Sequence, residues 1–259
     1  MQTRYKEKTV AAGDMLFVAV YAQHRKAGAR RGRFRETSEV QAKNNERRSR
    51  DYLTWLIHCN FDRHGMIVHL TYADGWYPES EARFEKDVRN YIARLGRIYR
   101  KAGAEFKWVC VRAYGENGRC HVHLYCSGGV DRETVEAAWG MGRANVERLQ
   151  FNVCGVVDLS RYTWNQRHAG KRRWSGSRNL VKPVEKTDLT RYSAAALREI
   201  AECGNPHKIF ADRYPGYWLA EFPNVEKNDV NGSLYMTAVL YRPDSENLEA
   251  YVRKRGRKT

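Results

Sequence analysis

Residues 66–157 alternate between two hydrophobic periods, and this alternation restricts the possible folds more than any other feature of the sequence. Apolar residues recur at spacings of three and four over 79–102, which indicates an amphipathic helix that ends before Gly103. In 66–72 they recur at every second position instead, which indicates a strand. Asp131 is placed to cap a further short helix. The later segments with strand character are 105–114, 119–127 and 146–157.

The order of these elements is strand, helix, strand, strand, helix, strand. Because only GENG separates 105–114 from 119–127, these two strands should pair as an antiparallel hairpin. We therefore predict an α+β fold in which helices cover one face of an antiparallel sheet, in a ferredoxin-like arrangement. A helix, short strands and a basic tail in 184–259 form a C-terminal extension, so we place the domain boundary after residue 183.

The N-terminal part of the first domain, 1–183, contains a strongly basic segment. Strand character begins at residue 14 and continues to residue 23. The following run HRKAGARRGRFRE is typical of a solvated loop or of an arm that contacts DNA. A helix is expected over 37–61, where apolar residues form a stripe near its end.

The charge of the chain indicates a polyanionic partner. The 259 residues include 46 Lys and Arg against 30 Asp and Glu, a formal net charge of +16. This excess is larger than solubility requires, and nucleic acid is the leading candidate for the partner. The sequence contains no apolar run long enough to span a membrane and no apolar signal core, so we expect a cytoplasmic protein without a membrane partner.

Two further patterns exclude other classes of protein. The six cysteines include no C-x-x-C pair and lie mostly in apolar runs, so we expect free thiols and no disulfide framework. The nearest approach to a phosphate-binding loop, AGKRRWS, lacks both the first glycine and the hydroxyl after the lysine, which excludes a P-loop ATPase domain.

The strand at 119–127 carries two histidines on one face. By parity, Cys120, Val122 and Leu124 point to the core, so His121 and His123 should lie on the opposite, exposed face. Together with Glu116 in the preceding turn, they could hold a manganese or magnesium ion.

Two other interpretations of the histidine pair remain open. Spacing alone favours solvent-facing histidines and a turn carboxylate that bind nothing. A structural zinc site that uses Cys120 and Cys126 is disfavoured, because these cysteines lie on the opposite face from the histidines.

Four blocks of sequence change this balance when they are considered together. They are HLTY at 69–72, GENGRCHVHLY at 115–125, DLSRY at 158–162 and GKRRWSGSRNLVKP at 170–183. In order and spacing they resemble the rolling-circle replication initiators of small phages and plasmids, which belong to the HUH endonuclease superfamily. The resemblance covers roughly residues 14–183 and implies an RRM-like nicking domain.

The resemblance also implies an activity and its residues. His121, His123 and Glu116 match the family's metal ligands for Mn or Mg, and Tyr162 stands at the position of its nucleophile. Such a tyrosine attacks a DNA phosphodiester, becomes linked to the 5′-phosphate and releases a 3′-hydroxyl. The implied function is nicking and joining at a single-stranded DNA origin, with or without a hairpin, and the implied partners are the helicase and polymerase of a bacterial host.

The sequence departs from the family pattern at one position. The family tyrosine is usually followed three residues later by lysine, and Asn165 occupies that position here. Arg161, Arg167 or Lys171 could supply the missing cation. Alternatively, the chain could be a catalytically impaired protein that binds single-stranded DNA on the same fold. A zinc-dependent hydrolase is a third class, but it lacks a recognisable general base beside the histidines.

The two aromatic candidates have plainer alternatives of their own. Tyr162 could instead pack a short helix on the sheet, and Tyr192 is then the reserve nucleophile. Trp174, within a basic segment, suits a groove that follows a DNA backbone and stacks a base, and the plainer alternative is a solvated loop. The candidate DNA-binding residues are Arg161, Lys171, Arg172, Arg173, Trp174, Arg178 and Lys182.

Overall fold

The computed structural model describes all residues except 1–3, 24–38, 116–117, 166–172, 229–231 and 249–259. The chain divides into two compact units. One contains residues 56–151 and 156–181, and the other contains residues 1–55, 152–155 and 182–259. The predicted boundary after 183 lies close to the break at 181/182, but the N-terminal residues join the C-terminal ones in a single unit. The predicted basic arm at 24–36 lies outside the described residues.

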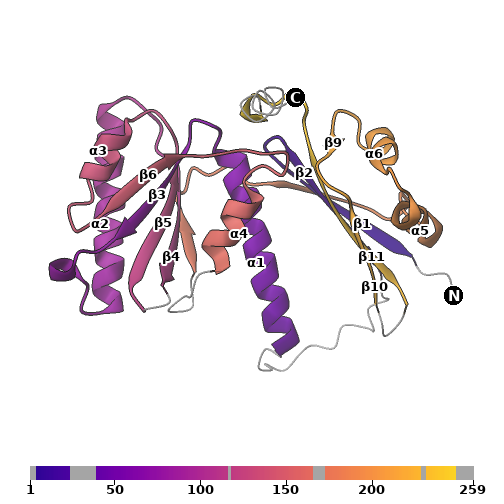
Figure 1. Ribbon diagram of the computed structural model, residues 1–259, viewed down its shortest axis with the longest axis horizontal. Coiled ribbons are helices and arrows are strands. Elements are labelled where there is room, and N and C mark those ends of the chain that lie inside the picture. Colours follow the sequence, from indigo (N-terminus) through magenta and orange to yellow (C-terminus); the bar gives the residue numbers. More distant parts are fainter. Residues whose placement is uncertain (1–3, 24–38, 116–117, 166–172, 229–231, 249–259) are drawn as a thin grey trace. The chain divides into compact units, whose positions relative to one another are not determined.

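The unit that contains residues 56–151 is built on an antiparallel sheet with the strand order β6-β3-β5-β4-β7 (Figure 1). The predicted hairpin is confirmed, since every residue of β4 is paired with one of β5. The strand predicted at 146–157 is wrong beyond residue 148, where the chain leaves the sheet and makes a turn at 152–155. The strands are β3 (Met66–Thr71), β4 (Trp108–Tyr114), β5 (Cys120–Cys126), β6 (Ala144–Arg148) and β7 (Trp174–Gly176).

Two helices cover the face of this sheet that carries Val122 and Leu124. They are α2 (Glu81–Lys101) and α3 (Arg132–Ala137). Each begins at a predicted or typical cap, because the side chains of Ser80 and Asp131 accept hydrogen bonds from the backbone N–H three residues later. The stripe on α2 that the sequence predicts includes Leu95, which is fully buried in this core.

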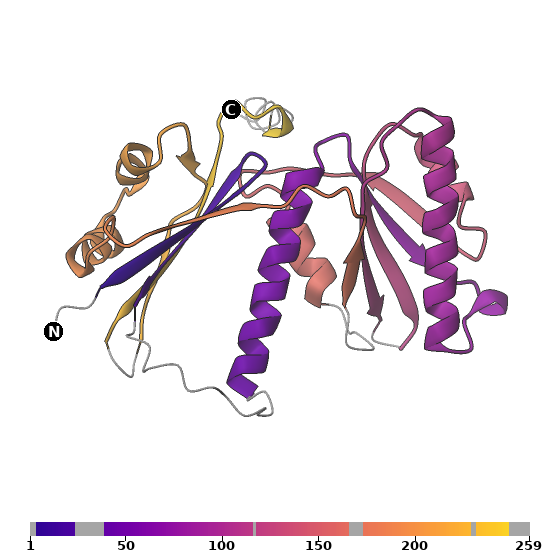
Figure 2. The same cartoon turned by 180° about the vertical axis from the view of Figure 1, so that it is seen from behind.

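The opposite face of the sheet is partly covered by α4 (Val157–Asn165), and Figures 1 and 2 show α2 and α4 on opposite sides of the sheet. The hydroxyl of Tyr125 lies 3.3 Å from the carbonyl oxygen of Leu159 and 3.1 Å from Oγ1 of Thr163, both on α4. The α+β class is therefore confirmed, with helices on both faces. The face of the histidines is not exposed as predicted, because α4 and the residues after α1 (Glu39–Asn60) lie against it.

The other unit is built on a second antiparallel sheet of order β10-β11-β2-β1-β8, with β9 paired to β11. Helices α5 (Ala194–Glu202) and α6 (His207–Arg213) contribute Leu197, Ile200 and Phe210 to its core. The strands are β1 (Tyr5–Ala12), β2 (Met15–Ala22), β8 (Val184–Asp188), β9 (Trp218–Leu219), β10 (Asn224–Lys227) and β11 (Leu234–Tyr241).

A buried polar cluster lies in this second core. Glu7 of β1 is 3% exposed, accepts a hydrogen bond from the hydroxyl of Tyr214 and lies 3.5 Å from Nε of Arg191. Burial raises the pKa of Glu7 above its ordinary value, although Tyr214 and Arg191 act in the opposite direction. Tyr192 belongs to the same cluster, 3.0 Å from Tyr214 between hydroxyl oxygens. None of the helices among the described residues has the length and apolar character needed to cross a membrane.

Candidate functional site

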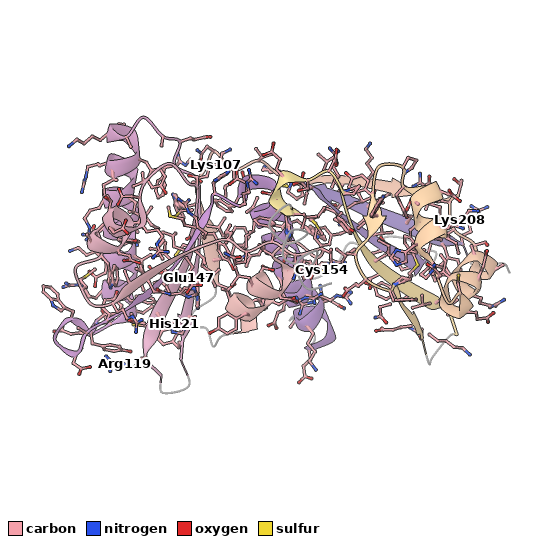
Figure 3. All side chains as sticks on the ribbon, turned by 45° about the horizontal axis from the view of Figure 1, so that its top comes forward. Lys107, Arg119, His121, Glu147, Cys154 and Lys208 are labelled. Atoms are coloured by element: carbon pink, nitrogen blue, oxygen red, sulfur yellow. The ribbon has the colours of Figure 1, made fainter. Side chains whose placement is uncertain are left out.

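Three histidines gather on the second face of the β6-β3-β5-β4-β7 sheet. The register of β3 against β5 places His69 directly opposite His123, and their Nδ1 atoms lie 2.9 Å apart. His121 lies on the same face two residues earlier, and its ring centroid is 5.0 Å from that of His123. Figure 3 shows His121 beside Glu147 of β6, whose charge acts to raise the pKa of His69. The histidine cluster is therefore larger than the pair that the sequence predicts.

Burial keeps this cluster uncharged. His123 is 3% exposed, and burial followed by the charges of His69 and His121 lowers its pKa to about 3. Burial also lowers the pKa of His69 and of His121. All three rings are thus neutral at pH 7, which is the form of imidazole that binds metal ions.

The cluster meets some requirements of a cation site. Nε2 of His123 is buried and has no hydrogen-bond partner among the described residues. The 2.9 Å between the Nδ1 atoms of His69 and His123 is close to the roughly 3 Å between adjacent ligands of an octahedral ion with bonds of about 2.1 Å. Within the described residues, however, no group of three or more His, Cys, Asp or Glu is arranged to hold a metal ion. Glu116, the predicted carboxylate ligand, lies outside the described residues.

Tyr162 lies beside the histidines on α4. Its ring centroid is 6.1 Å from that of His123, and the two rings are nearly perpendicular. Tyr162 is 55% exposed, whereas Ser160, Thr163 and Trp164 are buried. These three residues pack the helix, so the side chain of Tyr162 is not needed for packing.

The reserve nucleophile has a different environment. Tyr192 is 5% exposed in the other unit, and its hydroxyl is engaged with Tyr214. Burial raises its pKa, which disfavours the phenolate. Tyr192 is therefore a core residue.

The segment around Trp174 is an edge strand instead of the predicted loop. In β7, Trp174 is paired with Val111 of β4, which is itself paired with His123, so the three side chains share one face of the sheet. Trp174 is half-buried, and the guanidinium carbon of Arg173 lies 4.8 Å from the ring centre of Trp164.

The remaining predicted DNA-binding residues are distributed as follows. Arg161 and Arg178 are exposed in the same unit as the histidines, and Lys182 is exposed in the other unit. Lys171 and Arg172, like the alternative cation Arg167, lie outside the described residues.

Comparison with known families gives one match. A family model for replication-associated proteins of the ORF2 type matches residues 65–167. This region begins just before β3 and ends just after α4, so it contains His69, His121, His123 and Tyr162. The match indicates a role in the initiation of DNA replication. Comparison with curated proteins and with solved structures gives no match.

The structure assigns one site residue that the pattern analysis omitted. His69 stands in the HLTY block, but its position opposite His123 depends on the register of β3 against β5. Parity offered a signal, because Met66, Val68 and Leu70 take the core face and leave His69 on the other.

Proposed function

We propose that this protein nicks and rejoins single-stranded DNA through a 5′-phosphotyrosine intermediate on Tyr162, and so initiates rolling-circle replication of a phage or plasmid. The observation that carries the proposal is an exposed tyrosine beside a cluster of buried, neutral histidines. The match of the replication-associated family model to this region supports it.

His69, His121 and His123, together with Glu116, would hold a manganese or magnesium ion. When bound, such an ion polarises the scissile phosphate and stabilises the charge that develops on its oxygens. The chain's own contribution is to keep the imidazoles neutral, through burial that lowers their pKa values.

In the proposed reaction the hydroxyl oxygen of Tyr162 attacks the phosphorus in line with the 3′-oxygen. A bond forms between this oxygen and phosphorus, the bond from phosphorus to the 3′-oxygen breaks, and the 3′-oxygen takes up a proton as the tyrosine loses one. Ionising a tyrosine hydroxyl at neutral pH costs about 4 kcal/mol, so nearby positive charge is required. Arg161, exposed next to Tyr162, is available to supply it. The phosphotyrosine retains the energy of the cleaved bond, and the 3′-hydroxyl can therefore reverse the reaction to rejoin the strand.

An adduct assay tests the proposal. Wild-type protein is incubated with a labelled single-stranded origin oligonucleotide and Mn²⁺, and the expected product is a protein–DNA adduct that survives denaturation. Tyr162→Phe should bind the oligonucleotide but form no adduct, while Tyr21→Phe, a matched control on β2 of the other unit, should form it normally. Replacement of both His121 and His123 by alanine should also abolish the adduct.

Two outcomes count against the nicking function. If the wild type binds the oligonucleotide but yields no adduct with either metal, the chain is the DNA-binding protein that Asn165 suggests. If the double histidine variant still cleaves, the metal site is misassigned.

A further inference from the structure

Aromatic side chains are exposed beyond the end of β3. The short 3-10 helix η1 (Asp74–Trp76) follows this strand and leaves Trp76 56% exposed and Tyr77 39% exposed. In the described part of this unit, the exposed large hydrophobic side chains are Trp76, Tyr77, Tyr162 and Val181. One of the three aromatics is the proposed nucleophile, and the other two are not needed for its chemistry or for the core.

Hydrogen bonds fix Tyr77 to the hairpin that precedes the histidines. Its hydroxyl donates to the carbonyl oxygen of Gly118 at 3.3 Å and accepts from the backbone N–H of Cys120 at 3.1 Å. The guanidinium of Arg119 lies 5.5 Å from the ring centre of Tyr77 and donates to Asp74 at 2.8 Å. The position of Tyr77 and Arg119 is therefore set before any ligand arrives.

The backbone of η1 is fixed from its other side. The backbone N–H of Ala73 donates to the carbonyl oxygen of Met141 at 3.0 Å, and that of Thr71 donates to the carbonyl oxygen of Arg143 at 2.9 Å. Between them lies Gly142, where a Cβ would come within 2.4 Å of the carbonyl oxygen of Thr71. Trp76 is thus presented on a held segment, which lowers the entropy cost of stacking a ligand on it.

These aromatic side chains lie close to the histidines. Arg119 precedes His121 by two residues, a distance of about 7 Å along an extended chain. Nδ1 of His121 lies 3.4 Å from the carbonyl oxygen of Arg119, and Thr71 is the strand partner of His121. Figure 3 shows Arg119 and His121 at the same end of the sheet.

We propose that Trp76, with Tyr77 and Arg119 beside it, binds an unpaired nucleobase of the strand that is cut, next to the scissile phosphate. Every base has an aromatic face that stacks on indole or phenol, and a guanidinium adds a cation–π contribution. The net charge of +16 favours a polyanion over an apolar peptide as the occupant of this surface. The inference rests on the proposed function, since it assumes that the bound strand is the one that is nicked.

The test separates base binding from cleavage. Affinity for single-stranded DNA is measured without divalent metal in a Tyr162→Phe background, where no covalent linkage can form. Trp76→Ala should weaken binding by about 5- to 150-fold, and Trp76→Phe, which keeps an aromatic face, should retain most of the affinity. Trp218→Ala is the matched control, because Trp218 is 58% exposed in the other unit and lies outside the region of the family match.

A set of oligonucleotides with one abasic site each locates the stacked base. One abasic position should weaken binding by the protein with Trp76 and should have no further effect on Trp76→Ala. The proposal is overturned if Trp76→Ala binds as tightly as its parent, if Trp218→Ala loses as much affinity, or if no abasic position depends on Trp76. If these results hold while the wild type forms no adduct, the base-binding site stands and the nicking function fails.

Discussion

The hydroxyl of Tyr125 connects the sheet to the helix that carries Tyr162, and its removal tests how the site is positioned. Tyr125 is fully buried on β5, with its hydroxyl 3.1 Å from Oγ1 of Thr163 and 3.3 Å from the carbonyl oxygen of Leu159. Tyr125→Phe removes these contacts and keeps the ring, which stacks 6.4 Å from Phe61 between centroids.

The expected loss of stability is modest. Oγ1 of Thr163 also donates to the carbonyl oxygen of Ser160 at 3.0 Å, so the substitution leaves no buried donor without a partner. One buried hydrogen bond then contributes about 1 kcal/mol to the free energy of unfolding. For a cooperative unit of roughly 100–150 residues this lowers Tm by about 3–6 °C.

The same free energy limits the effect on catalysis. If about 1 kcal/mol of docking energy is lost from α4, the population with Tyr162 in place falls by at most about fivefold, and the single-turnover rate of nicking should fall by no more than this. Tyr91→Phe is the matched control, since its buried hydroxyl donates to Val135 at 2.9 Å on the opposite face of the sheet. It should lower Tm by a similar amount and leave nicking unchanged.

Thermal unfolding and single-turnover nicking measure the two effects on the same samples. The positioning role of Tyr125 is refuted if Tyr125→Phe lowers Tm as expected but nicks as fast as Tyr91→Phe. A complete loss of nicking would refute it differently, because a docking hydrogen bond cannot account for that much.

Three further predictions concern the histidines, the second core and the loop beside η1. His69→Ala should raise the Mn²⁺ concentration needed for half-maximal nicking by about tenfold or more, and an unchanged requirement would remove His69 from the metal site. Because burial raises the pKa of Glu7 above 4.5, the folded state binds more protons than the unfolded state between these two values, so stability is lost as pH rises through the folded pKa. Glu7→Gln should lack this loss in denaturant unfolding between about pH 4 and pH 8, and a difference from wild type that is independent of pH would contradict the assignment. Gly142→Ala, at φ 150° and against the carbonyl of Thr71, should cost about 2 kcal/mol or more in chemical denaturation, while Gly75→Ala, whose Cβ meets nothing within 4 Å, should be nearly neutral; equal effects would show that the loop adjusts.

Local periodicity predicted the elements whose burial pattern is regular. The stripe on α2 and the alternation in β5 each have one apolar face, and the structure confirms both. Strand β1 was missed because Glu7 occupies a buried position and breaks the apolar pattern, and only the contacts with Tyr214 and Arg191 make that carboxylate tolerable there. Such contacts join residues about two hundred positions apart and leave no local signal.

The candidate site shows the same division. Parity placed His121 and His123 on one face, and the position of Tyr162 on a helix after the next strand followed from the resemblance. The burial of His123 did not follow, because it depends on how α4 packs over the sheet. Trp174 was assigned to a loop because its short strand is basic and rich in glycine and serine, and its pairing with Val111 supplies the order that its own sequence lacks.

The site of covalent linkage tests the central claim most directly. The adduct formed by the wild-type protein is digested, and mass spectrometry identifies the peptide that carries the nucleotide. The account predicts a phosphotyrosine at Tyr162 that is linked to the 5′-phosphate of the cleaved strand. A linkage to any other residue, or to a 3′-phosphate, would contradict it.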